Sequence, residues 1–169
     1  MTVLISHEIV TEPDNYAEAL ARDDSLLWYN AMAIEIGKLE GIGAWELVEL
    51  PEGRTAIGCQ WVYAVKTKPD GKFDTARARV VTQGFTQRPG MDYFDITAPV
   101  VKFNSLRVLL AIGNTLDWEI KMLDVKSAFV NSNLDEEIYM RQPDGFNDGS
   151  NRVLRLHKAL YGLKQAGRA

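Results

Sequence analysis

The sequence has very few of the side chains that build disulfides or zinc sites. Cys59 is its one cysteine, which excludes an internal disulfide and is typical of proteins from reducing compartments. The two histidines, His7 and His157, lie far apart in the chain with no cysteine partner nearby. We therefore expect no zinc site, because zinc in proteins is bound mainly by clustered cysteine and histidine side chains.

Long apolar runs are also missing. No stretch approaches the roughly 20 apolar residues that cross a membrane. The N-terminal sequence MTVLISHEIVTEPDNY has neither a basic start nor a long apolar segment, so we expect no signal peptide and an intracellular protein. The apolar fraction of 46% is nevertheless large enough for a folded core, and 169 residues suit one ordinary domain.

Charge of either sign is unevenly distributed along the chain. Residues 1–53 carry 2 Lys/Arg against 11 Asp/Glu, whereas residues 54–107 carry 9 against 4. The net charge of −4 argues against a simple nucleic-acid-binding protein. The basic middle third is compatible with a surface that faces phosphates, or with charges that merely keep a hairpin soluble.

The N-terminal 43 residues are expected to form an acidic helical segment. Pro13-Asp14-Asn15 is a plausible entry to YAEALA, which reads as a short helix. Asp24-Ser25 can cap a second helix, LLWYNAMAIEIGKLE, that ends near Gly41 and Gly43. An imperfect apolar stripe along this second helix indicates that it packs against a core.

A β-hairpin is the clearest local prediction. IGCQWVYAVKTK is rich in aromatic and β-branched residues, Pro69-Asp70-Gly71 has turn chemistry, and KFDTARARVVTQGF returns. Side chains on a strand alternate between its two faces, so Lys66 and Lys68 should share one face, and Arg77 and Arg79 should share one face.

The remaining elements alternate between strands and helices. We expect strands at AWELVEL, WEIKMLDV, EEIYM and RVLRL, and a helix at LRVLLAIGNTL capped by Asn104 or Ser105. The segment KSAFVNSNL should turn or form a helix. Helix pairs combined with antiparallel strands predict the α+β fold class.

Asp124 is the most informative single residue. It follows the apolar residues Met122 and Leu123, and a carboxylate among apolar side chains is costly unless it is paired or bound to a metal. At the end of a strand it is well placed to hold Mg²⁺, a hard ion that prefers oxygen ligands. The residue can equally be an exposed carboxylate on an edge strand, or the cap of the following helix.

Three long motifs occur in a fixed order: IGCQWVYAVKTKPDGKFDTARARVVTQGFTQRPGMDYFDITAPVVKFNSLRVLLAIG, LDVKSAFVNSNLDEEIYMRQPDGF and LHKALYGLKQAGRA. Together they resemble the first half of the Ty1/copia-type retrotransposon reverse transcriptase. The resemblance implies a truncated fingers and palm arrangement, with residues 44–169 forming the fingers and the first part of the palm. It also implies an RNA-directed DNA polymerase that extends a primer with deoxynucleotides, and a cytoplasmic particle as the location of the parent element.

The resemblance assigns roles to individual residues. Asp124 resembles the first metal-binding aspartate of the palm, and Val125 the residue whose backbone carbonyl also reaches the Mg²⁺ ion. Ser127 and Ala128 would offer backbone N–H groups to the triphosphate. Phe129 resembles the aromatic residue under the sugar that excludes a 2′-OH, with a core phenylalanine as its alternative.

Further residues are implied in nucleotide binding. Lys66 and Arg79, with Arg77 as a third cation, would hold the triphosphate, or they are solvated hairpin charges. Gln165 resembles a glutamine that packs against the nucleotide, or it is an ordinary surface residue. Tyr161 supports the match without an assigned contact.

One departure from the family pattern bears on activity. These polymerases carry Tyr/Phe-x-Asp-Asp on a later hairpin, and the single Asp-Asp of this sequence, Asp23-Asp24, lies in the acidic N-terminal segment. The resemblance covers neither the rest of the palm nor the RNase H and integrase parts of the parent polyprotein. We expect the isolated chain to be inactive as a polymerase. It can instead be a non-catalytic nucleic-acid-binding remnant that uses the basic hairpin at 60–80, or an inert fragment.

Overall fold

The computed structural model describes residues 10–98, 100–123 and 128–168. These residues form helices and antiparallel strands without mixing them in alternating units, which confirms the α+β prediction. Among the described residues, no helix has the length and apolarity needed to span a membrane.

Two helices open the described part of the chain. Helix α1 (Tyr16–Ala21) begins as predicted, because the Asn15 side chain accepts a hydrogen bond from the Glu18 backbone N–H at 3.0 Å. Helix α2 (Ser25–Gly41) also begins where expected, with Asp24 as its N-cap residue, but the Asp24 side chain makes no capping hydrogen bond. The Asp24 carboxylate instead accepts hydrogen bonds from Arg22 Nε at 2.8 Å and from Trp28 Nε1 at 3.1 Å.

Strands β2 (Cys59–Thr67) and β3 (Phe73–Thr82) form the predicted hairpin as a two-stranded antiparallel ribbon. The connecting turn contains Gly71 at a φ of 80°, a conformation that glycine adopts without steric cost. A register shift between Lys66 and Thr67 interrupts the alternation near this turn. Lys68 lies beyond the shift and outside β2, so the strand alternation no longer relates it to Lys66.

A second sheet combines three strands in the order β1-β5-β4, all antiparallel: β1 (Trp45–Val48), β4 (Asn133–Met140) and β5 (Val153–Lys158). Ile57 connects this sheet to the hairpin. Its N–H donates to the Tyr139 carbonyl at 2.8 Å, and its own carbonyl accepts from the Arg141 N–H at 2.9 Å. The hairpin is therefore anchored to the sheet by backbone hydrogen bonds on both sides of Ile57.

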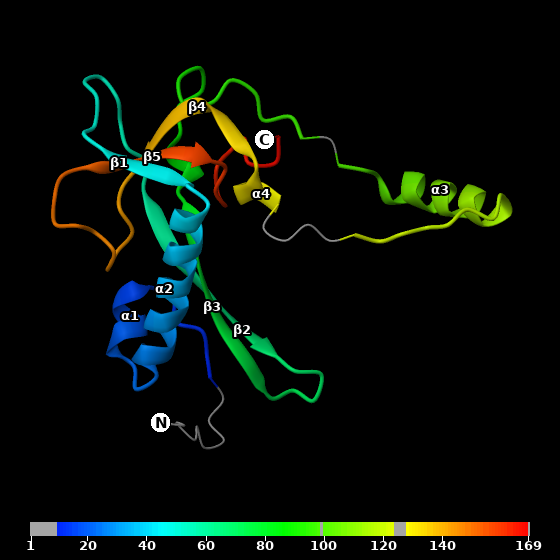
Figure 1. Ribbon diagram of the computed structural model, residues 1–169, viewed down its shortest axis with the longest axis horizontal. Coiled ribbons are helices and arrows are strands. Elements are labelled where there is room, and N and C mark those ends of the chain that lie inside the picture. The colour runs from blue at the N-terminus through cyan, green and yellow to red at the C-terminus, as the bar shows by residue number, and fades with distance from the viewer. Residues whose placement is uncertain (1–9, 99, 124–127, 169) are drawn as a thin grey trace.

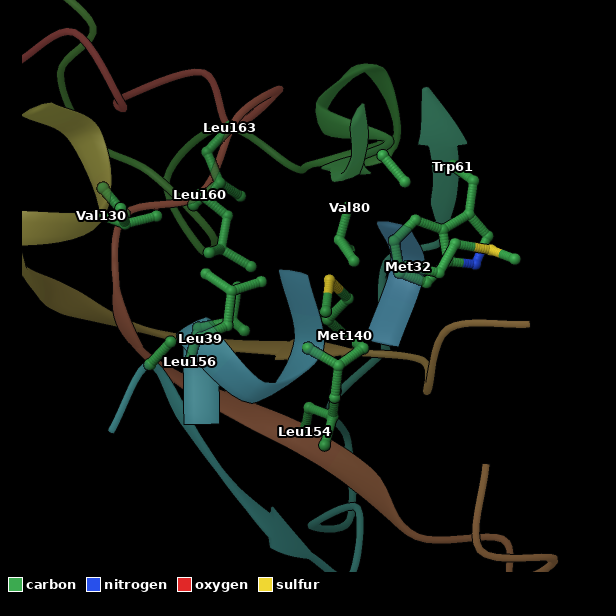
Figure 2. Packing of buried hydrophobic residues seen from close by; sticks show 14 of the residues in the cluster. Met32, Leu39, Trp61, Val80, Val130, Met140, Leu154, Leu156, Leu160 and Leu163 are labelled. Carbon is green, nitrogen blue, oxygen red and sulfur yellow. The ribbon is translucent and has the colours of Figure 1, made fainter. Parts of the chain in front are cut away.

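The core lies where α2 packs against the inner face of the hairpin and the three-stranded sheet (Figure 2). The Trp28 and Tyr63 rings meet edge to face with 5.3 Å between centroids, and the Tyr63 hydroxyl donates to Met32 Sδ at 3.3 Å. Trp28, Met32 and Leu39 are fully buried, and each contributes about 1.5–3 kcal/mol by burial. This packing fixes which face of the hairpin is left to solvent.

Residues 100–123, the apolar arm, run out from this core and back again. Helix α3 (Phe103–Thr115) occupies the outer part of the arm and stands away from the other elements in Figure 1. The predicted cap at Asn104 or Ser105 is wrong, because the helix begins at Phe103 with Lys102 as its N-cap residue. Apolar side chains of the arm are unusually exposed, with Val100 at 85% and Met122 at 97%.

The returning half of the arm differs from the predicted strand. Helix α3 is followed, after its C-cap residue Leu116, by Asp117 in a left-handed conformation with a φ of 53°, and the Trp118 N–H donates to the Gly113 carbonyl at 2.8 Å. Residues 118–123 then form no strand, because no neighbouring strand lies within the described residues to pair with them. Apolar alternation alone does not hold a strand without a partner. The turning segment that follows contains α4 (Ala128–Asn131).

Candidate functional site

The outer face of the β2–β3 hairpin brings together three of the predicted site residues. In the antiparallel register, Val62 pairs with Arg79, Ala64 with Arg77 and Lys66 with Thr75. Residues directly opposite each other share a face, so Lys66, Arg77 and Arg79 all lie on one side. The alternate residues of both strands, including Tyr63 and Ala78, are buried on the other side. We call this cationic side the hairpin face.

The cations of the hairpin face are exposed, and none of them is ion-paired with another described residue. Within the described part of the chain, no carboxylate lies within 4.0 Å of the charged groups of Lys66, Arg77 or Arg79. The charge of Arg79 does act on the carboxyl group of Glu35 in α2. Partial burial raises the pKa of this carboxyl, and the charges of Lys38 and Arg79 oppose that increase. Three exposed cations on one face, none of them ion-paired among the described residues, form a surface suited to phosphate groups.

Tyr161 contributes to this face although no contact was predicted for it. The Arg79 guanidinium lies over the Tyr161 ring, 5.0 Å from its centroid, which is a cation–π geometry. The ring comes from the C-terminal segment, far from the hairpin in sequence. No local pattern could have indicated this contact, because it depends on how two distant segments are joined.

Two glycines make that junction possible. The Tyr161 carbonyl accepts hydrogen bonds from the Thr82 N–H at 2.8 Å and from the Thr82 hydroxyl at 3.1 Å. Gly162 has a φ of 92°, and a Cβ atom there would lie 2.1 Å from the Thr82 carbonyl oxygen. A Cβ on Gly84, at the start of the 3₁₀ turn η1 (Gly84–Thr86), would likewise lie 2.0 Å from the Gly162 oxygen. Only glycine permits the two backbones to approach this closely.

Gln165 lies in the same junction, and it is buried rather than on the surface. Only 2% of the residue is exposed, so the alternative of an ordinary surface glutamine is wrong. Its Oε1 accepts from Gln87 Nε2 at 3.1 Å, and its Nε2 donates to the Asp92 carbonyl at 3.0 Å. Gln87 Oε1 in turn accepts from the Lys164 N–H at 2.8 Å. In this structure the Gln165 amide holds residues 87–92 to the C-terminal segment, and its predicted contact with a nucleotide stays a prediction.

The predicted metal-binding and sugar-sensing positions fall in the segment after the apolar arm. Asp124, Val125 and Ser127 lie outside the described residues. Ala128 and Phe129 begin α4, where the structure describes the backbone but not their side chains. Among the described residues, no group of three or more His, Cys, Asp or Glu could hold a metal ion. The predicted binding of Mg²⁺ by Asp124 and the Val125 carbonyl stays a prediction.

Known proteins provide an independent comparison. Residues 42–169 match the family model described as reverse transcriptase (RNA-dependent DNA polymerase). No solved structure matches the chain.

The relatives extend the match over nearly the whole chain. The retrovirus-related Pol polyprotein from transposon TNT 1-94 of Nicotiana tabacum is 42% identical over 98% of this chain, and that from transposon RE1 of Arabidopsis thaliana is 40% identical over 99%. The chain spans about 12% of the length of each of these polyproteins. An uncharacterised mitochondrial protein of Arabidopsis thaliana is 32% identical over 72% of this chain and 73% of its own length. The chain therefore belongs to the reverse transcriptase (RNA-dependent DNA polymerase) family, as a fragment of the copia type found in retrotransposons.

Proposed function

We propose that these residues are the fingers and the first part of the palm of a retrotransposon RNA-directed DNA polymerase. The parent reaction adds deoxynucleotides to the 3′ end of a primer under the direction of a template. Its partners would be an RNA or DNA template–primer and a deoxynucleoside triphosphate. The family match and the Pol polyprotein relatives support this assignment.

The hairpin face is the proposed contact with phosphates. The observation that carries this proposal is the convergence of Lys66, Arg77 and Arg79 on one exposed face with no ion-paired carboxylate within the described residues. Guanidinium groups match phosphate oxygens in pairs, and the lysine ammonium adds a compact positive charge. The Tyr161 ring holds Arg79 over one part of the face and limits the orientations of its side chain.

We further propose that these 169 residues do not polymerise on their own. Mg²⁺ at the parent active site would be held by Asp124 and the Val125 carbonyl together with the later Asp-Asp pair. No Tyr/Phe-x-Asp-Asp occurs in this sequence. A single carboxylate holds Mg²⁺ poorly, and phosphoryl transfer depends on that charge stabilisation.

Primer extension tests the proposed inactivity. The purified chain is incubated with Mg²⁺, a primed RNA or DNA template and the four deoxynucleoside triphosphates, beside the Asp124→Asn variant. We expect no template-dependent product from either protein. Extension by the wild-type chain that disappears in Asp124→Asn would show that these residues hold a working site.

Salt-dependent binding tests the hairpin face. Removing the three cations as Lys66→Gln/Arg77→Gln/Arg79→Gln should weaken binding of a DNA duplex. It should also make the slope of log K against log salt less negative by about 0.9 for each phosphate that the variant no longer neutralises. The matched control is Lys102→Gln/Arg107→Gln/Lys121→Gln, which removes the same charge from the apolar arm. Equally weakened binding in both variants would indicate an effect of net charge and contradict a specific face.

A non-catalytic nucleic-acid-binding protein is the second candidate function. The exposed cations of the hairpin face, which have no ion pair within the described part of the chain, favour it, because they need no metal site to attract a phosphate backbone. Both candidate functions predict the salt-dependent binding described above. They predict different results for primer extension by a longer protein that includes the rest of the palm. If a longer protein that includes the Asp-Asp motif extends primers and loses this activity in Asp124→Asn, the polymerase assignment holds. If that protein binds template but never extends it, the non-catalytic candidate is favoured.

A further inference from the structure

A pocket of about 470 Å³ lies away from the hairpin face, between the loop before β2, the end of β4 and the loop that leads into β5. Three arginines from these separate segments line it: Arg54, Arg141 and Arg152. None of its lining residues is an aspartate or a glutamate. The lining therefore contains three cationic residues and no acidic one, which favours an anionic ligand.

Two of the arginines form ion pairs with carboxylates of residues that do not line the pocket. Arg54 is ion-paired with Glu137 of β4, and Arg152 is ion-paired with Asp148. Hydrogen bonds from Ser150, and then from Gln142, hold the pKa of Asp148 well below its ordinary value. Asp148 therefore stays ionised, and it fixes the loop before β5 rather than binding a cation from solution.

Arg141 is the third arginine of the lining and differs from the other two in its interactions. Its backbone is fixed, because its N–H donates to the Ile57 carbonyl at 2.9 Å and its carbonyl accepts from Cys59 Sγ at 3.4 Å. Its guanidinium makes no ion pair or hydrogen bond with any of the residues in 10–98, 100–123 and 128–168. A fixed backbone under a free guanidinium favours a ligand, since little backbone order has to be gained on binding.

Neutral groups complete the lining. Asn147 and Asn151 are among the lining residues, and their side-chain amides have no hydrogen-bond partner within the described residues. Leu50 and Val153 add apolar surface. A tetrahedral phosphate can accept from a guanidinium and from amides at the same time, and the apolar surface leaves room for a sugar or base.

We propose that this pocket binds the phosphate group of a nucleotide, either free or as one unit of a nucleic-acid strand. Arg141 supplies the principal charge, and Asn147 and Asn151 supply additional donors. The site is built from elements other than the hairpin face, and it stands whether or not the chain polymerises.

The test uses the full chain with the hairpin-face cations removed, Lys66→Gln/Arg77→Gln/Arg79→Gln, so that phosphates bound there do not contribute. Deoxyadenosine monophosphate, inorganic phosphate, deoxyadenosine and a short single-stranded DNA are titrated in EDTA, with amide shifts recorded by NMR. We expect the monophosphate to shift the amides of Asn147, Asn151 and Arg152, and deoxyadenosine to bind at least about 10-fold more weakly. Inorganic phosphate binding as well as the monophosphate would identify phosphate alone as the ligand, whereas a preference for the DNA would identify a strand.

Arg141→Gln should weaken binding about 10-fold, and Arg141→Lys should weaken it less because the charge remains. Lys121→Gln on the apolar arm is the matched control and should bind like its parent. Far-UV circular dichroism checks that each variant is folded. The proposal is overturned if no phosphate probe shifts these amides at millimolar concentration, or if Arg141→Gln binds as tightly as its parent.

Discussion

The guanidinium of Arg79 rests on the ring of Tyr161, 5.0 Å from its centroid, and joins the hairpin to the C-terminal segment. The same two segments are joined by two hydrogen bonds to the Tyr161 carbonyl, one from the Thr82 backbone N–H and one from the Thr82 hydroxyl. These hydrogen bonds hold the Tyr161 ring next to β3, and the stacking on that ring orients the Arg79 guanidinium of the hairpin face.

This contact should be measurable as a coupling free energy. In a double-mutant cycle of Arg79→Gln and Tyr161→Leu, urea denaturation should give a coupling of about 0.5–1 kcal/mol, as for exposed cation–π pairs. Arg77 shares the face but lies farther along β3 from Thr82 and the junction, so the cycle of Arg77→Gln with Tyr161→Leu should be additive. Additivity in both cycles would contradict a stabilising role for the stacking.

Substitution of Gly162 should be among the most damaging changes in the C-terminal segment. Gly162→Ala combines a left-handed backbone with a Cβ placed 2.1 Å from the Thr82 carbonyl oxygen. We expect the free energy of unfolding to fall by about 3 kcal/mol or more, because backbone strain and overpacking add. Gly149→Ala is the control, since its φ of 78° is similar but no atom lies within 4 Å of the added Cβ. Equal destabilisation in chemical denaturation would show that the close approach to Thr82 is not the cause.

The buried amide of Gln165 should stabilise the junction whatever its role toward a nucleotide. Gln165→Leu leaves Gln87 Nε2 and the Asp92 carbonyl without partners in a buried site. Each unpaired buried group costs about 1–3 kcal/mol, so the urea midpoint should fall clearly. Gln60→Leu, at an exposed position on β2, should change stability by less than about 0.5 kcal/mol. A Gln165→Leu protein as stable as the wild type would contradict the hydrogen-bond network.

Cys59 should react slowly with thiol reagents. Burial, and then the charge of Asp144, raise the pKa of this thiol to about 12. The thiolate is the reactive form, and it is favoured only as the pH rises through that value, so little is present at pH 8. Iodoacetamide should modify the folded chain at pH 8 on the order of 100-fold more slowly than the chain in urea. Similar rates in the two conditions would indicate an accessible thiol of ordinary pKa.

Local patterns were sufficient to predict the hairpin and the shared face of Arg77 and Arg79. The aromatic and β-branched residues of β2 and the turn at Pro69-Asp70-Gly71 indicate the hairpin, and the period-two alternation of a strand places Arg77 and Arg79 on one side. Helix α2 was predicted with nearly its observed bounds, because its apolar residues bury against a core. The hydrogen bonds of the Asp24 side chain were not predicted, since its carboxylate accepts from Arg22 and Trp28 and not from the backbone N–H groups at the start of the helix.

Long-range relationships were beyond such patterns. Gln87 stands in a loop rich in glycine and proline, and nothing around it indicates that its amide meets Gln165. Residues 118–123 carry apolar side chains typical of a strand, but a strand also needs a neighbour to accept its hydrogen bonds. The prediction failed there because side-chain pattern does not supply a pairing partner.

The apolar arm should make the isolated chain self-associate and bind apolar dyes. Val108 on α3 is 58% exposed and Met122 is 97% exposed, and contiguous exposed apolar surface of this kind favours association. Val108→Lys/Met122→Lys should shift sedimentation velocity toward the monomer and lower anilinonaphthalene sulfonate fluorescence, with little change in Tm because neither side chain is buried. The control Leu26→Lys/Ile34→Lys alters equally exposed positions on α2, at 68% and 73%. If both pairs act alike, association depends on net charge; if only the arm pair acts, residues 100–123 are the association surface that a partner would cover.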